Sequence, residues 1–254
     1  MRGTCGRSGL MLLYPAIDLR GGKVVQLTQG DFSREQIYGD DPVAVAQAFA
    51  AAGAPWIHTV DLDAARTGEP VNRPLIAAIA AAVEVPVQAG GGVRSVAAAA
   101  ALAEVGVARV IMGTAALENP DLVAAVAARQ PVALGLDVRG REVAVRGWEE
   151  RAGVEWPDAL RRLADAGAEA VVITQIEVEG LMGGADAAGL MEVLGATSLE
   201  VIASGGVGNL ADLLALNAVS VEGRRLAGVI VGTALYEGHL DVAEAVVALR
   251  ARRS

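Results

Sequence analysis

The chain has few of the residues that build disulfides and metal centres. Among 254 residues, Cys5 is the only cysteine, and His58 and His239 are the only histidines. A single cysteine excludes an intrachain disulfide, and nothing here argues for secretion. So few Cys and His side chains leave no pattern with metal-ligand spacing. We therefore expect a cytoplasmic protein that needs neither a metal nor another cofactor.

Long apolar runs and aromatic residues are also scarce. No stretch approaches the roughly 18 uncharged apolar residues of a membrane span. Aromatic residues make up 3% of the chain against 53% hydrophobic residues, so the core must consist mainly of Ala, Val, Leu and Ile. A net charge of −9 excludes a general attraction to nucleic acid or to an anionic membrane.

The first ten residues differ from the rest of the chain. Residues 1–10 are polar and lack the apolar segment of a signal peptide. We expect them to form a disordered extension that precedes a single domain over residues 11–254.

Short apolar runs then alternate with Ala- and Leu-rich segments at helical spacing. The expected strands are Leu12–Leu19, Trp56–Leu62, Val85–Ala89, Ala108–Met112, Val132–Val138, Ala170–Ile176, Glu200–Ala203 and Gly228–Val231. The expected helices are Pro42–Ala52, Pro74–Val83, Val96–Val105, Leu122–Ala128, Trp156–Ala166, Ala187–Leu194, Leu210–Leu216 and Val242–Arg250. Strict alternation of strands and helices predicts a parallel sheet, either an open doubly wound sheet or a closed barrel.

An internal repeat favours the barrel. The motif Ile17–Gly21 returns 119 positions later as Leu136–Gly140, and Ile111–Ala115 returns at the same offset as Ile230–Ala234. Between them, Gly91–Val93 matches Gly205–Val207 at an offset of 114, which indicates an insertion near 219–225. Three matches in one order predict an α/β fold, a single (β/α)₈ TIM barrel built from two duplicated half-barrels. The chain length fits one such barrel of about 250 residues.

The repeat places two carboxylates opposite each other. Asp18 ends the first expected strand and Asp137 ends the fifth, half a turn away. Residues at these strand ends form the active sites of barrel enzymes. A lone Asp after a strand can instead be a helix N-cap or a loop ion pair, but here apolar strand residues flank both and no helix follows at once. Two opposed carboxylates without a Cys/His cluster indicate proton transfer.

Glycine signals at the strand ends also occur in opposed sets. Glycine lets backbone N–H groups approach phosphate oxygens, and the helix start beyond it adds its positive dipole end. The two sets are Gly91, Gly92, Gly113 and Thr114, and Gly205, Gly206, Gly232 and Thr233. They predict two phosphate sites across the mouth, and therefore a long substrate with two phosphates.

These motifs together resemble one family. The matching segments are Tyr14–Gly22, Val25–Asp31, His58–Asp63, Gln88–Arg94, Gly135–Val138, Gly147–Trp148 and Ala203–Val207. They are similar to the ribotide isomerases of histidine biosynthesis (the HisA family), over nearly all of residues 12–250. The resemblance implies an Amadori rearrangement of an aminoaldose to an aminoketose, on a phosphoribosylformimino-aminoimidazole carboxamide ribotide that carries two phosphates. The protein would then act as a monomer on this small molecule.

The resemblance also implies roles for individual residues. Asp18 would accept a proton, Asp137 would donate one, and Thr174 would assist. Trp148 would stack on the substrate, and Arg94 falls within a substrate-binding motif. For His58 within its strand, a core imidazole with its hydrogen bonds satisfied is the favoured interpretation.

Some residues keep other activities open. Arg146 resembles a bifunctional branch that also handles phosphoribosyl anthranilate, in which the residue at Glu179 serves as general acid. The ammonia-dependent cyclase of the same pathway shares the half-barrel repeat. Gln26 stands where an Arg is usual, Gln175 replaces a carboxylate and Leu181 replaces a hydroxyl residue, so a phosphate-binding barrel without activity is a further alternative.

Overall fold

The computed structural model describes residues 10–145, 148 and 150–250. Eight parallel strands of this part form a closed barrel, because β7 pairs with β10 as well as with β6. The barrel strands are β1 (Leu12–Arg20), β4 (Ile57–Asp61), β5 (Val87–Gly90), β6 (Arg109–Met112), β7 (Val132–Arg139), β10 (Ala170–Gln175), β11 (Glu200–Ser204) and β14 (Gly228–Val231). The predicted TIM barrel is confirmed. The extension expected at residues 1–10 lies, except for Leu10, outside the described residues.

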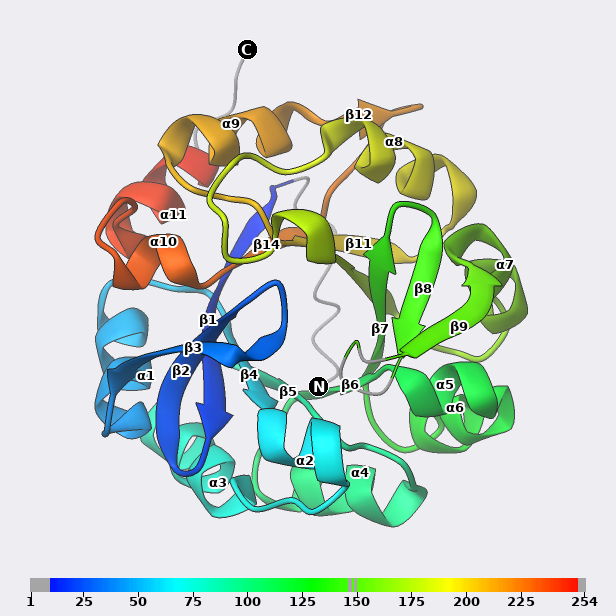
Figure 1. The fold of residues 1–254 in the computed structure, drawn as a ribbon, viewed down its shortest axis with the longest axis horizontal. Helices are drawn as coiled ribbons and strands as arrows, with labels where there is room; N and C mark the ends of the chain where they lie inside the picture. The colour runs from blue at the N-terminus through cyan, green and yellow to red at the C-terminus, as the bar shows by residue number, and fades with distance from the viewer. Residues whose placement is uncertain (1–9, 146–147, 149, 251–254) are drawn as a thin grey trace.

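A ring of helices surrounds the barrel (Figure 1). The outer helices are α1 (Pro42–Ala51), α3 (Arg73–Ala82), α4 (Val96–Glu104), α6 (Pro120–Ala127), α7 (Trp156–Leu163), α8 (Ala187–Ala196), α9 (Leu210–Ala218) and α11 (Val242–Arg250). Each overlaps a helix predicted from the sequence. Four short elements follow strand ends and were not predicted, namely α2 (Leu62–Thr67), α5 (Thr114–Glu118), η1 (Ile176–Val178) and α10 (Thr233–Tyr236). Among the described residues, no helix has both the length and the apolarity to traverse a bilayer.

The core has two parts. The larger one fills the space between the barrel and its helices with Val, Leu, Ile and Ala side chains. The smaller one lies on inward strand positions and includes Tyr14, Trp56, Ile111, Val172 and Ile230. The barrel is thus a packed structure with an open upper end, as in other barrels of this kind.

Two hairpins extend the first strand of each half on opposite sides of the barrel (Figure 1). Antiparallel strands β2 (Lys23–Thr28) and β3 (Asp31–Gly39) continue from β1, and β8 (Glu142–Val145) and β9 (Glu150–Glu155) continue from β7. Asp18 pairs with Val25 and Asp137 pairs with Ala144, so the hairpins repeat at the same offset of 119. The sequence analysis did not identify either hairpin.

The insertion inferred near 219–225 forms a small hairpin of its own. Strands β12 (Ser220–Val221) and β13 (Arg224–Arg225) pair with each other and lie outside the barrel sheet. The five-residue slip in the repeat therefore has a structural cause that leaves the barrel closed.

In each half of the barrel, the side chain of the last residue of one strand forms hydrogen bonds with the N-cap residue of an outer helix. These residues are Asp61 of β4 and Gln175 of β10. Asp61 accepts hydrogen bonds from the backbone N–H and the side chain of Asn72, the N-cap residue of α3. At an offset of 114, Gln175 contacts the backbone of Asp186, the N-cap residue of α8, accepting from its N–H at 2.8 Å and donating to its carbonyl at 3.0 Å. An amide here can both donate and accept, which a carboxylate cannot. The lost carboxylate at Gln175 therefore affects loop geometry.

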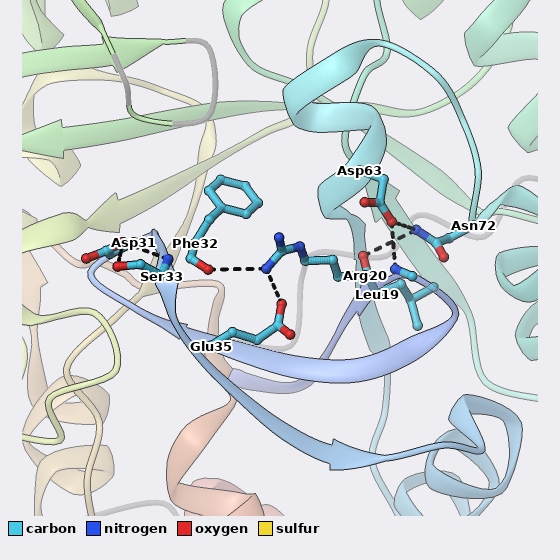
Figure 2. A network of polar contacts seen from close by, with 9 residues as sticks. Leu19, Arg20, Asp31, Phe32, Ser33, Glu35, Asp63 and Asn72 are labelled. Atoms are coloured by element: carbon cyan, nitrogen blue, oxygen red, sulfur yellow. Dashed lines mark hydrogen bonds and ion pairs between the residues drawn. The ribbon is translucent and has the colours of Figure 1, made fainter.

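Polar contacts fasten the first hairpin to the barrel rim, as Figure 2 shows. Arg20 donates to the Phe32 carbonyl at 3.2 Å and contacts Glu35 at 2.5 Å. On the other side of the turn, Asn72 donates to Asp63 at 2.9 Å, and Asp63 accepts the N–H of Gly21 at 2.8 Å. These bonds fix the turn that follows Asp18 and bring the hairpin tip over the upper end of the barrel.

Candidate active site

One pocket opens at the carboxyl ends of the barrel strands. It brings together every described residue to which the sequence analysis assigned a role. These residues are Asp18, Gly91, Gly92, Arg94, Gly113, Thr114, Asp137, Trp148, Thr174, Glu179, Gly205, Gly206, Gly232 and Thr233. Arg146, the residue suggestive of the bifunctional branch, lies outside the described residues, so the inference drawn from it stays a prediction.

Asp18 projects into this pocket from the inner face of β1. The carboxyl group is buried, and desolvation raises its pKa from 3.8 to about 7. Gln26, on the neighbouring strand β2, donates from Nε2 to Asp18 Oδ2 at 3.3 Å. A buried carboxylate with a single long contact is a base of near-neutral pKa, which is what general base catalysis at neutral pH requires.

Asp137 occupies the equivalent position on β7. It pairs in register with Thr174 of β10. Burial raises the pKa of Asp137, while hydrogen bonds from the side chains of Thr174 and Trp148 act in the opposite direction. Its two hydrogen-bond partners hold the carboxyl group in place, so Thr174 and Trp148 orient Asp137 towards the pocket.

Glu179 follows η1 and adds a third carboxyl group. Its Oε2 is buried and has no hydrogen-bond partner among the described residues. Burial, and then the charges of Asp18 and Asp137, raise the pKa of Glu179 to about 8. At neutral pH this group is mostly protonated, so the pocket can hold an ionised and a protonated carboxyl group at once. That combination can remove a proton and supply one.

Backbone cradles lie on either side of the carboxyl groups. No side chain caps the N-terminus of α5 or of α10, whose N-cap residues are Gly113 and Gly232. In contrast, Ser95 and Asn209 cap the longer helices α4 and α9. Uncapped first-turn amides that open into a pocket are suited to bind an anion.

The turns next to these helices need glycine, because their φ angles are positive and there is no space for a Cβ atom. Gly92 has φ of 69°, and a Cβ there would lie 2.6 Å from the Ala64 carbonyl oxygen. Gly206, its equivalent in the second half, has φ of 84° and would clash with the Gly184 carbonyl. Both glycines line the pocket, and with no side chain at either turn their backbone is open to a ligand on either side of the acids. This arrangement supports two anion sites.

Three segments meet above the pocket. The Trp148 indole lies directly against Gly30, where any Cβ would overlap the ring. Gln29 donates its backbone N–H to the Glu179 carbonyl at 3.1 Å and its side-chain amide to the Glu177 carbonyl at 2.9 Å. Phe32 lies between two guanidinium groups, 5.1 Å from Arg20 and 5.3 Å from Arg66. The β2–β3 hairpin, Trp148 and the segment after η1 thus contact one another over the acids.

Some residues differ from what the sequence suggested. The Arg94 guanidinium is exposed and donates to the Ala65 carbonyl at 3.1 Å, so it lies at the pocket margin. Gln175 and the exposed Leu181 are outside the pocket lining, so two of the departures from the family pattern do not touch this site. The third departure, Gln26, does line the pocket, and so do Phe32 and His58, which were not assigned to it. Their only signal was position, on an inward strand face or in a hairpin.

A neutral amide, that of Gln26, lies next to the Asp18 carboxyl group. Gln26→Arg would place a positive charge there and so tests whether Asp18 is the base. A guanidinium within about 4–6 Å stabilises a carboxylate and lowers its pKa by about 1–3 units. Activity that requires ionised Asp18 falls as pH decreases through this pKa. The acidic limb of kcat/KM against pH should therefore move to lower pH in Gln26→Arg, measured in steady-state assays.

Gln26→Met is the matched control, because it has a similar length and no charge. Its acidic limb should stay within half a unit or so of wild type, since burial remains the main cause of the raised pKa. An unmoved limb in a folded Gln26→Arg protein would remove Asp18 as the group that this limb reports.

No group of three His, Cys, Asp or Glu side chains within the described ranges is arranged to hold a metal ion. The expectation of chemistry without a metal or cofactor stays a prediction.

Comparison with known proteins gives a consistent result. The family model described as "Histidine biosynthesis protein" matches residues 12–241. A protein of a Picosynechococcus species is 46% identical over 245 residues, which cover 96% of this chain and 95% of that protein. A protein of Paracoccus denitrificans is 46% identical over 241 residues, 94% of this chain and 100% of that protein. Both bear the name 1-(5-phosphoribosyl)-5-((5-phosphoribosylamino)methylideneamino)imidazole-4-carboxamide isomerase.

Proposed function

The chain belongs to the histidine biosynthesis protein family and is an isomerase of that family, and we propose that Asp18 and Asp137 catalyse the reaction beside a largely protonated Glu179. The substrate is the one in the name of its relatives, an aminoaldose with a phosphoribosyl group at each end. The reaction is the aldose–ketose rearrangement expected from the resemblance.

The observation that carries the assignment of roles is the placement of Asp18 and Asp137. Both carboxyl groups are desolvated in the pocket, both lie near the carboxyl ends of strands on opposite sides of one barrel, and both lie between two backbone cradles. A substrate with a phosphate at each end would be held in the cradles with its reacting ribose over the acids. Because both phosphates of the substrate would be held, the reacting atoms of the ribose would be oriented towards the two carboxyl groups.

The proposed chemistry balances within the substrate and these groups. Asp137 gives a proton to the ribose ring oxygen as the C1–O bond breaks, which leaves an iminium group at C1. Asp18 takes the proton from C2, and the electron pair of that C–H bond forms the C1–C2 double bond of an enolamine. Loss of the hydroxyl proton at C2 and protonation of C1 then give the ketone. Each assisted proton transfer is worth about 10²–10⁴ in rate.

The expectation of a monomer stays a prediction. The formal charge of −9 supports the expectation of no nucleic-acid partner.

A paired assay tests the proposal. Purified protein is given the histidine-pathway aminoaldose in one reaction and phosphoribosyl anthranilate in the other. We expect turnover of the first that exceeds turnover of the second by at least about 100-fold, a difference of the size that contacts to one substrate's polar groups produce. Comparable turnover of both would favour the bifunctional reading, and turnover of neither would contradict the assignment. Ammonia-dependent product formation with a glutaminase partner would indicate the cyclase instead.

A further inference from the structure

A buried row of hydrogen-bonded polar side chains, called here the polar row, lies on three adjacent barrel strands beneath the pocket. His58, Gln88 and Arg109 lie on the adjacent strands β4, β5 and β6, with 7%, 0% and 3% of their surfaces exposed. Gln88 Nε2 is 2.9 Å from His58 Nδ1. Arg109 contacts Gln88 Oε1 from Nε at 3.1 Å and from Nη2 at 2.5 Å. Its other contacts are the Tyr14 hydroxyl and Glu169, each at 3.2 Å.

The barrel fold does not require the polar row, because the second half of the barrel has no such row at the equivalent positions. At the repeat offsets, His58 corresponds to Val172, Gln88 to Ile202 and Arg109 to Gly228. The strand registers agree: His58 pairs with Gln88 and Gln88 with Arg109, and Val172 pairs with Ile202 and Ile202 with Gly228. The same positions are filled there by apolar residues or glycine. Burying polar and charged groups costs free energy that apolar residues avoid. The polar row therefore calls for a functional explanation.

The contacts determine which nitrogen of His58 carries the proton. A guanidinium can only donate, so the Gln88 atom that meets Arg109 must be the acceptor oxygen. The remaining Gln88 group, the NH₂, also can only donate, so His58 Nδ1 must be an unprotonated acceptor. A neutral imidazole has one N–H, which then resides on Nε2.

The ring also stays neutral. The charged groups on β4 and on the strands around it are Asp18 and Arg20 on β1, Asp61 on β4 and Arg109 on β6. Burial, and then the field of Arg109, lower the pKa of His58 to about 3. Glu169, half exposed, faces Arg109 rather than the ring. At neutral pH, His58 is therefore an uncharged group with one fixed donor.

That donor is directed at the pocket. His58 lines the pocket, whereas Gln88, which holds Nδ1, is fully buried. The hydrogen bond recorded for His58 uses Nδ1, which leaves Nε2 for the pocket side of the ring. In register, His58 pairs with Ala16, two residues before Asp18 on β1. Ala16 and Gly135 also line the pocket and are small, so a ligand can reach this depth.

We propose that His58 is a substrate-binding residue whose Nε2–H donates to an oxygen of the sugar beside Asp18, and that Arg109 and Gln88 are positioning residues that fix this tautomer. The identity of the bound sugar rests on the proposed function, whereas the tautomer does not. A neutral donor binds an oxygen without a charge that would lower the pKa of the nearby Asp18.

The tautomer can be measured without substrate. The chain has two histidines, so ¹⁵N-histidine labelling gives two rings, and His239→Gln identifies the other. We expect His58 to be neutral from about pH 5 to 8, protonated at Nε2 and unprotonated at Nδ1. A proton on Nδ1, or titration within that range, would overturn the proposal.

Gln88→Glu should reverse the tautomer. A carboxylate accepts from Arg109 and from His58, so it draws a proton onto Nδ1. Glu169→Gln, which changes the other contact of Arg109, should leave the His58 signals as in wild type. If Gln88→Glu leaves the proton on Nε2 alone, the positioning role of Gln88 is wrong.

Turnover separates binding from structure. His58→Leu should reduce kcat/KM by about 10- to 100-fold, the effect of losing one buried hydrogen bond. His58→Gln keeps an N–H donor near the Nε2 position and should retain more of the activity than His58→Leu. Equal activity of these two variants and wild type would exclude substrate contact. Absence of turnover in the wild-type protein would contradict the proposed function. The NMR measurement of the His58 tautomer needs no substrate, so it would still test the roles of Gln88 and Arg109.

Discussion

Asp18→Asn is expected to reduce kcat by about 10²- to 10⁴-fold, the contribution of a general base. The amide has nearly the same shape as the carboxyl group, so substrate should still bind, and KM should change much less than kcat. The measurement is steady-state kinetics at pH above 7, where Asp18 of the wild type is ionised.

Stability provides the control for this variant. The pKa of Asp18 is higher in the folded protein than its ordinary value of 3.8, so ionisation of this group disfavours the folded state as pH rises towards and beyond 7. Asparagine removes that unfavourable charge. The Tm of Asp18→Asn at neutral pH should therefore equal or exceed that of wild type. Near-normal kcat in a stable Asp18→Asn protein would rule out Asp18 as the base.

Asp137→Asn should likewise reduce kcat by about 10²- to 10⁴-fold, because the amide cannot donate a proton to the ring oxygen as the C1–O bond breaks. Thr174 and Trp148 can still contact the amide oxygen, so the side chain should remain oriented. The basic limb of the pH profile in wild type reports the donor, and activity should fall as pH rises through its pKa.

Glu179→Gln is the matched comparison for Asp137→Asn. Glu179 is mostly protonated at neutral pH because its pKa is about 8, and glutamine reproduces that neutral form. If Glu179 serves only as a neutral hydrogen-bonding group, Glu179→Gln should lose less than about tenfold in kcat. A loss equal to or larger than that of Asp137→Asn would transfer the donor role to Glu179. Single-turnover measurements on both variants would separate the chemical step from product release.

The sequence predicted the barrel and its opposed acids because both follow from periodicity. The matched segments around Asp18 and Asp137 place the two residues on equivalent strands before any contact is known. The β2–β3 hairpin was not predicted because its second strand, Asp31–Gly39, is mostly exposed and lacks alternating apolar positions. Its conformation depends on contacts with the rim, such as those of Arg20.

Side-chain partners were the other missing information. Gln26 was interpreted as a lost guanidinium, but the strand pairing that brings it to Asp18 is part of the same unpredicted hairpin. Gln175 was interpreted as the loss of a carboxylate, yet its amide bonds to the backbone of Asp186. The raised pKa values of the three acids depend on burial and, for Glu179, on the charges of Asp18 and Asp137, and neither is a property of one residue's neighbours in sequence.

The two cradles have a consequence for the direction in which a ligand enters. Their backbones are alike, although the Gln26 side chain lies against Gly232 in one of them, so a molecule with a phosphate at each end could bind in either orientation. Only one orientation presents the correct ribose for reaction. The discrimination has to come from the middle of the cavity, where the halves differ. Glu179 corresponds to Ala65 and His58 to Val172 at the repeat offset, and all four line the pocket. Replacing these two polar groups by their counterparts would therefore weaken the preference for one orientation of the ligand.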